Sequence, residues 1–229
     1  MKEEFQTIIE SEDLKNITLD LVEQVMDSKI SEDIIKEIPI LKSIVTIRNV
    51  YSSYSDRIFI KKALTVLMEI GEINWKQRVE LNRELDDEDE KGSEKILMAI
   101  DKLETIKKCK VFGRLCKLKA LGKINREDFL RLTKLLQDAY LDDLELVPYF
   151  SSLIEQKRKI YEEEFVPLIS LGIIYQHPGE QKPIEKAYQY EEGDPEFKGG
   201  NIEFHYLFSI LGDLVNKYFY ELLPDEIEK

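Results

Sequence analysis

Residues 64–85, LTVLMEIGEINWKQRVELNREL, and residues 115–136, LCKLKALGKINREDFLRLTKLL, carry one pattern when the second is offset from the first by 51 positions. Each stretch has a leucine-rich run that stops at a Gly and restarts at an Asn. A Gly past the last helical turn and an Asn before the next are typical end and start signals of helices. The repeat therefore predicts two helical hairpins, in which Gly71 and Gly122 end the first helices and Asn74 and Asn125 cap the second.

The rest of the chain also favours helices, because its apolar residues recur at spacings of three and four. We predict an all-α fold, a multi-helix bundle with a duplicated helical hairpin and a small C-terminal β-hairpin. The strands of that hairpin are predicted at AYQY (187–190) and NIEFHY (201–206), which alternate polar with aromatic residues, and a last helix follows over 206–223. Two domains are expected: 1–147, which holds both repeats, and 148–229, with helix, hairpin and helix packed on the first.

The composition describes a folded, acidic protein. Of 229 residues, 43% are apolar and 34% are charged, and the net charge is -13. This charge argues against a surface that binds nucleic acid or anionic membrane as a whole, since such surfaces use Lys and Arg. Cys109 and Cys116 lie seven positions apart, on one side of a helix, and no apolar leader follows Met1. We therefore expect reduced thiols and a cytoplasmic location.

One segment reverses the charge of the chain. Residues 102–126 hold nine basic residues and one acid, Glu104. This basic helix is a candidate for binding a phosphate-rich ligand or an acidic partner, and it can equally neutralise acidic helices packed beside it. Its candidate binding residues are Lys107, Lys108, Lys110, Arg114, Lys117 and Lys119.

Residues 38–50, IPILKSIVTIRNV, form the most apolar stretch of the first half. Lys42 and Arg48 interrupt it well short of the roughly 20 apolar residues that a membrane span needs. Two interpretations remain, a buried core helix and an amphipathic helix at a membrane interface.

The sequence predicts no catalytic residue, no cofactor and no metal site. His177 and His205 are far apart and belong to no metal-ligand motif, and a thiol in an apolar-periodic helix is typically buried and inert. The acidic run 86–90 lacks the alternate ligand spacing of a calcium loop, so we expect a solvated loop.

Two stretches resemble known families. LISLGIIY (168–175) and IEFHYLFSILGDLV (202–215) resemble the end of a winged-helix domain, in which a helix, a hairpin wing and a final helix follow one another. The helix before the wing, which would enter the DNA groove, carries three adjacent carboxylates at 162–164, and DNA phosphates would repel them. The resemblance therefore implies a wing that contacts protein.

The repeated unit resembles the helical tellurite-resistance B-type domains of bacteria. Ile70 and Leu121 stand where that family has an Asp before the Gly, so its metal binding is not implied here. The turn GKINREDFLRL (122–132) is similar to turns of uncharacterised bacterial and prophage helical proteins.

We therefore expect a non-catalytic protein-binding adaptor, inhibitor or accessory subunit of a bacterial or phage system. The expected partner is another protein, with a second copy of the chain as an option. The alternatives are nucleic-acid or nucleotide binding through 102–126, which the charge disfavours, and a membrane-associated defence effector that uses 38–50. Further candidate contact residues are Trp75, Tyr188, Tyr190, Phe204 and Tyr206.

Overall fold

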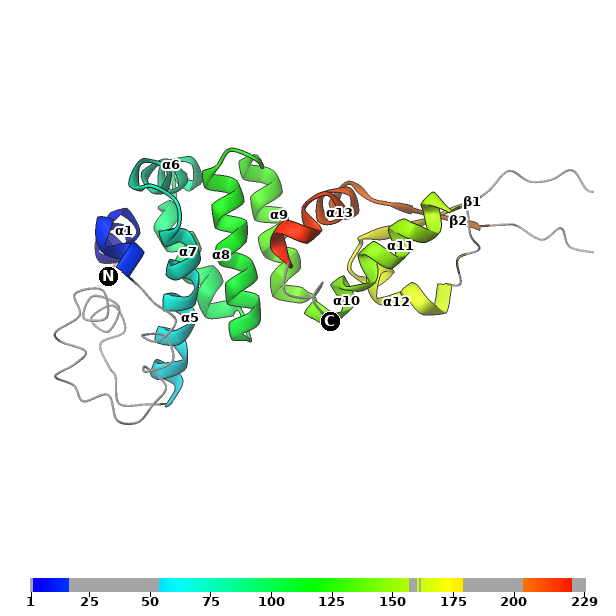
Figure 1. Ribbon diagram of the computed structural model, residues 1–229, viewed down its shortest axis with the longest axis horizontal. Coiled ribbons are helices and arrows are strands. Elements are labelled where there is room, and N and C mark those ends of the chain that lie inside the picture. The colour runs from blue at the N-terminus through cyan, green and yellow to red at the C-terminus, as the bar shows by residue number, and fades with distance from the viewer. Residues whose placement is uncertain (1, 17–53, 157–159, 161, 179–203, 224–229) are drawn as a thin grey trace, which may run out of the picture.

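The computed structural model describes residues 2–16, 54–156, 160, 162–178 and 204–223 (Figure 1). This part of the chain is mostly helical and includes one two-stranded antiparallel sheet. The elements, with the labels of Figure 1, are α1 (Lys2–Glu10), the 3-10 helix η1 (Glu12–Asn16), α5 (Tyr54–Gly71), α6 (Trp75–Leu85), α7 (Gly92–Lys102), α8 (Ile106–Ala120), α9 (Arg126–Asp138), α10 (Leu141–Leu144), α11 (Leu146–Glu155), α12 (Glu162–Ser170), β1 (Ile174–Pro178), β2 (Phe204–Phe208) and α13 (Ile210–Leu222).

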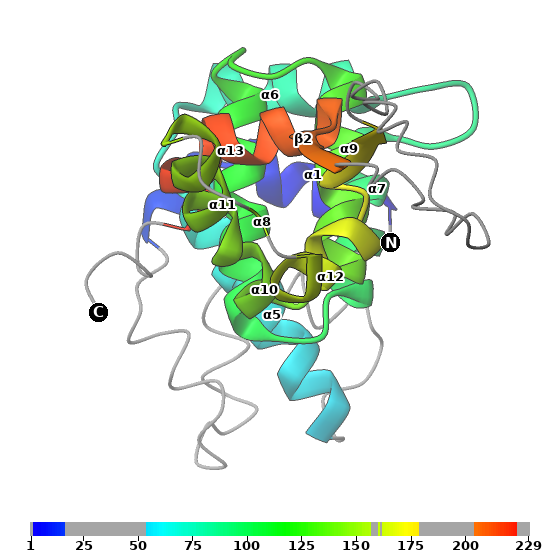
Figure 2. The same cartoon turned by 90° about the vertical axis from the view of Figure 1, so that its right-hand side faces the viewer.

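The helices form an elongated arrangement with α5 and α8 packed side by side (Figure 1). Helices α1, α6 and α7 contact one another at one end, and α9 packs on the other side of α8. Helix α13 contacts both α8 and α9 and joins them to α11, α12 and the sheet at the far end (Figures 1 and 2). One cluster of buried apolar residues runs through all these elements.

Both repeated stretches form the predicted helix, turn and helix. The side chain of Asn74 accepts a hydrogen bond from the Gln77 amide at the start of α6, and that of Asn125 accepts one from the Asp128 amide at the start of α9. The offset of 51 positions matches five pairs of apolar residues, and each of these residues is at most 6% exposed: Leu64 and Leu115, Leu67 and Leu118, Ile73 and Ile124, Leu81 and Leu132, and Leu85 and Leu136. The shared residues therefore build turns and core.

The two matched glycines serve different needs. Gly122 has φ 69°, and the amides of Gly122 and Lys123 bond back to α8 carbonyls, which is the usual left-handed helix ending. Gly71 is the last residue of α5 and lacks a positive φ. A Cβ on Gly71 would lie 2.9 Å from the Leu14 carbonyl oxygen, so this glycine makes room for η1. Both glycines therefore end their helices as predicted, Gly122 through its left-handed conformation and Gly71 without one.

The sheet differs in part from the prediction. The strand that pairs with β2 is 174–178, which the sequence pattern did not predict, and residues 187–190 lie outside the described part of the chain. Helix α13 begins at Ile210 rather than 206 because Ser209 ends the strand. The Ser209 amide donates to the Ile173 carbonyl, and its hydroxyl caps α13 by accepting from the Gly212 amide.

No helix in the described ranges is long and apolar enough to cross a membrane. Residues 38–50, the stretch with two interpretations, lie outside these ranges.

Candidate functional site

The basic helix α8 lies in the middle of the bundle, and two of its candidate binding residues are buried. Lys108 is 4% exposed and donates to the Gln137 carbonyl at 3.1 Å, and Lys119 is 5% exposed and pairs with Glu84. Burial lowers the pKa of Lys119. The prediction that Lys108 and Lys119 belong to a binding surface was therefore wrong, because both ammonium groups are used inside the protein.

Two further cations of α8, Arg114 and Lys117, also face acids or carbonyls of the same chain. The Arg114 Nε lies 3.7 Å from a Glu69 carboxylate oxygen, and another Arg114 nitrogen donates to the Leu222 carbonyl at 3.1 Å. Lys117 pairs with Glu72. Lys107 is exposed and Lys110 is half-buried, and each has a partner. These contacts support the interpretation that α8 neutralises the acidic helices around it.

The aromatic candidates are spread over the molecule. Trp75 begins α6, is 45% exposed, and has the Lys76 ammonium 6.0 Å from its ring centroid. Tyr206 was predicted as a contact residue but is 8% exposed, because its side of the sheet is packed. Phe204 lies in β2, while Tyr188 and Tyr190 are outside the described residues.

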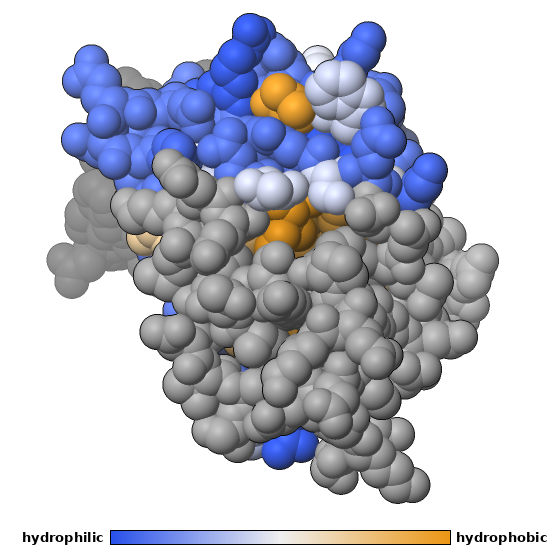
Figure 3. All heavy atoms as spheres, turned by 90° about the vertical axis from the view of Figure 1, so that its left-hand side faces the viewer, coloured by the Kyte–Doolittle hydropathy of each residue, from blue (hydrophilic) through white to orange (hydrophobic). Residues whose placement is uncertain are grey.

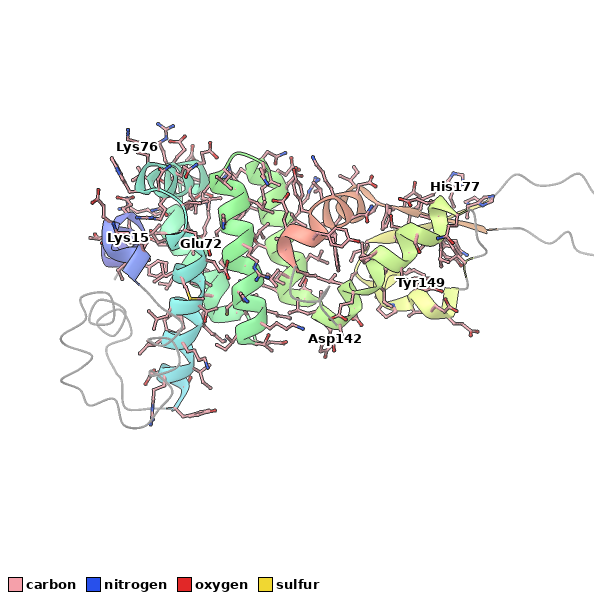
Figure 4. All side chains as sticks on the ribbon, in the orientation of Figure 1. Lys15, Glu72, Lys76, Asp142, Tyr149 and His177 are labelled. Carbon is pink, nitrogen blue, oxygen red and sulfur yellow. The ribbon has the colours of Figure 1, made fainter. Side chains whose placement is uncertain are left out.

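The face of the molecule near α1 and α6 is mainly hydrophilic, with small hydrophobic areas (Figure 3). Lys76 points outward at that end, far from the sheet (Figure 4).

An apolar depression lies elsewhere, between α9, the end of α12 and the start of α13. Its volume is about 530 Å³, and we call it the α9 groove. Four leucines line it, namely Leu130, Leu135, Leu171 and Leu211. In Figure 2, α12 lies below α13. An open apolar depression of this kind is typical of a site that receives side chains of another molecule.

Charged residues of α9 form the rim of the groove. Glu127 pairs with Arg131, and Lys134 pairs with Asp138, each one helical turn apart. These four side chains are 47% to 72% exposed, so the pairs contribute little to stability and can exchange partners. The rim thus offers two cations at its centre and an anion at each end.

Apolar side chains continue beyond the leucines. Ile210 directly precedes Leu211 and is 71% exposed, and Val166 is 51% exposed. Val166 precedes Ser170 by one turn of α12, so both lie on one face of that helix.

The sequence pattern did not predict this groove. Helix α9 buries Phe129, Leu132 and Leu136 at helical spacing, and Leu130 falls outside that stripe. A leucine on the polar side of an amphipathic helix was the available signal. The part of the groove lined by α12 and α13 could not be predicted from the sequence, because it depends on how segments distant in the chain pack together.

A second depression, of about 560 Å³, lies at the turn between α8 and α9 and borders α13. It is polar, and two of its three lysines pair with acids: Lys119 with Glu84, and Lys123 with Glu221. The Tyr218 hydroxyl donates to the Lys123 carbonyl at 2.7 Å. This hydrogen bond joins α13 to the turn between α8 and α9.

The acidic run 86–90 is an ordered turn. The Asp87 carboxylate accepts from the Asp89 and Glu90 amides and pairs with Lys95 and Arg126. The Lys95 hydrogen bond, followed by the Glu90 amide, lowers the pKa of Asp87 to about 2. Among the described residues, no three or more His, Cys, Asp or Glu side chains gather as a metal site.

The two histidines are brought together by the sheet. His177 of β1 and His205 of β2 are direct partners in the antiparallel register, and both are exposed. His177 lies near the outer end of the sheet (Figure 4).

Comparison of the chain with protein-family models, with curated proteins and with solved structures finds no match.

Proposed function

We propose that this protein is a non-catalytic adaptor or accessory subunit that binds a helical segment of a partner protein in the α9 groove. The observation that carries the proposal is a leucine-lined groove between paired charges, in which Leu130 is 37% exposed. An amphipathic helix laid in an apolar groove is a common mode of peptide recognition.

The rim defines the chemistry of that partner. The twelve residues from Glu127 to Asp138 span roughly 18 Å, which matches about three turns of a bound helix. The partner helix should carry apolar residues at spacings of three and four, with carboxylates opposite Arg131 and Lys134. Basic residues should lie opposite Glu127 and Asp138, which completes the charge pattern of the rim.

Nucleic-acid binding is supported less well. Binding to phosphates needs cations that are free to approach them. Lys108 and Lys119 are buried, and Arg114 and Lys117 face Glu69 and Glu72. We therefore keep it as the weaker alternative.

Two finer proposals accompany the main one. We infer that the two hairpins are copies of one unit, because matched positions share caps and burial. We also infer a reducing location such as the cytoplasm, since Cys109 and Cys116 are free and buried.

The test selects helical peptides from a displayed random library against the full chain and measures their affinity by calorimetry. We expect the selected peptides to share the apolar spacing and to lose at least about tenfold in affinity to a Leu130→Asp variant. Leu121→Asp is the matched control, because Leu121 is 41% exposed, against 37% for Leu130, and does not line the groove.

The proposal is wrong if Leu130→Asp and Leu121→Asp bind the peptides equally well. It is also wrong if Trp75→Ala abolishes binding while Leu130→Asp leaves it unchanged, because the contact surface is then at α6.

A further inference from the structure

The sheet places the two histidines of the chain opposite each other. The sequence of 229 residues contains two histidines, and the antiparallel register pairs them directly, His177 with His205. Alternate residues of a strand point to the same face, so the neighbouring pair on this face is Tyr175 with Leu207.

The opposite face of the sheet does the packing. Tyr206 is buried there, and its hydroxyl accepts a hydrogen bond from the Gln176 amide group at 3.2 Å. The face with the histidines is exposed: Tyr175 is 44% exposed and Leu207 is 40% exposed. Within the described part of the chain, neither imidazole takes part in a hydrogen bond or an ion pair. The imidazoles therefore remain available to a ligand.

Directly opposite residues of an antiparallel pair have Cβ atoms about 4.5–5.5 Å apart. Two imidazole rings attached at that separation can turn toward a single ion, to which each nitrogen binds at about 2.0–2.1 Å. We propose that His177 and His205 chelate one divalent transition-metal ion of the Zn²⁺, Ni²⁺ or Cu²⁺ class. One nitrogen of each ring binds the ion, and water fills its other positions.

The chemistry of the pair selects this class of ion. Imidazole nitrogen suits zinc, copper and nickel, whereas magnesium and calcium prefer oxygen ligands. The net charge of -13 raises the local concentration of cations around the protein. Both thiols are buried, and the described residues hold no larger cluster of ligands, so no stronger competing site lies among them. The site is independent of the α9 groove.

The test is a Zn²⁺ titration of the full chain by calorimetry near pH 7.5, with Mg²⁺ in large excess to occupy carboxylates. We expect one ion per chain. His177→Ala and His205→Ala should each weaken binding at least about tenfold, because one imidazole alone does not chelate.

A matched variant keeps two histidines but separates them. His205→Ala combined with Gln176→His places the imidazoles at adjacent positions, which point to opposite faces of β1. This variant should bind no better than His205→Ala alone. As a measurement that needs no substitution, the NMR signals of both imidazoles in the unaltered chain should change together and reach saturation at one equivalent of Zn²⁺.

Three results would overturn the site: no Zn²⁺ binding, binding that excess Mg²⁺ removes, or single variants that bind as tightly as the unaltered chain. Circular dichroism of each variant checks its fold, which should be intact because both side chains are exposed.

Discussion

The Nε of Arg78 donates a hydrogen bond of 2.7 Å to the carbonyl oxygen of Ile9, 69 positions earlier in the chain. The other nitrogens of the same guanidinium donate to the carbonyls of Ser11 and Ile73. Arg78 is 3% exposed, and its burial lowers its pKa. One buried cation therefore ties the end of α1 and the start of η1 to the turn between α5 and α6.

Replacement of Arg78 by Met should destabilise the protein by about 2–4 kcal/mol, because three buried carbonyls then lose their donor. The measurement is urea unfolding followed by circular dichroism. Arg83→Met is the control on the same helix, since Arg83 is exposed and pairs with Glu80, one turn away on that helix. It should change stability by less than about 0.5 kcal/mol, and equal effects of the two substitutions would contradict the role of Arg78.

Arg78 also shows how far the repeat could be read from the sequence. The offset of 51 places Arg78 opposite Phe129, whose ring lies 6.1 Å from that of Phe112 in the core. The helix starts and the buried leucines followed from local spacing. The partner of Arg78 could not be predicted in this way, because the residues around position 78 carry no information about a carbonyl 69 positions away.

The candidate sites follow the same division. The chemistry of His177 and His205 was visible, but their pairing depends on the register of β1 and β2, which is a non-local property. The positive charge of α8 could also be predicted from the sequence. The burial of Lys108 and Lys119 could not, because it depends on how the helices pack. Sequence patterns thus predicted elements and turns well, and predicted surfaces poorly.

The two matched glycines should respond differently to Ala. Gly122→Ala should destabilise by about 1–2 kcal/mol through backbone strain alone, since no atom lies within 4 Å of the added Cβ. Gly122→Asn should cost less, because Asn tolerates the left-handed conformation. Unfolding in urea measures both changes. Equal stabilities of the Ala and Asn variants would contradict a conformational role.

Gly71→Ala should act through contact instead. Its Cβ would lie 2.9 Å from the Leu14 carbonyl oxygen, so η1 has to move. We expect faster amide hydrogen exchange over residues 5–16, with little change at α9. Unchanged exchange in η1 would show that Gly71 does not hold this contact.

Cys109 and Cys116 should be unreactive in the folded protein. Burial raises the pKa of the Cys109 thiol to about 12 and raises that of Cys116 as well. The thiolate is the reactive form, so a thiol reagent at about pH 8 should modify neither residue unless the protein opens. Two thiols should react in denaturant, and rapid reaction of the native chain would disprove this burial.

Glu69 and Arg114 allow a test of buried charge between α5 and α8. Burial raises the pKa of Glu69 above 4.5, and Arg114 opposes this shift. A raised pKa means that the folded state holds the proton more tightly, so this contribution to stability is present at low pH. It is lost as the pH rises through the folded-state pKa. Gln resembles the protonated form at every pH.

Glu69→Gln should therefore gain stability relative to the unaltered chain as the pH rises from 4.5 toward 7. Arg114→Met should act in the opposite direction, by about 1–3 kcal/mol, because it leaves the Glu69 charge buried and the Leu222 carbonyl without its donor. Urea unfolding of the three proteins at several pH values measures both effects. If Glu69→Gln instead loses stability relative to the unaltered chain as the pH rises, the attraction between Glu69 and Arg114 outweighs the cost of burying the Glu69 charge.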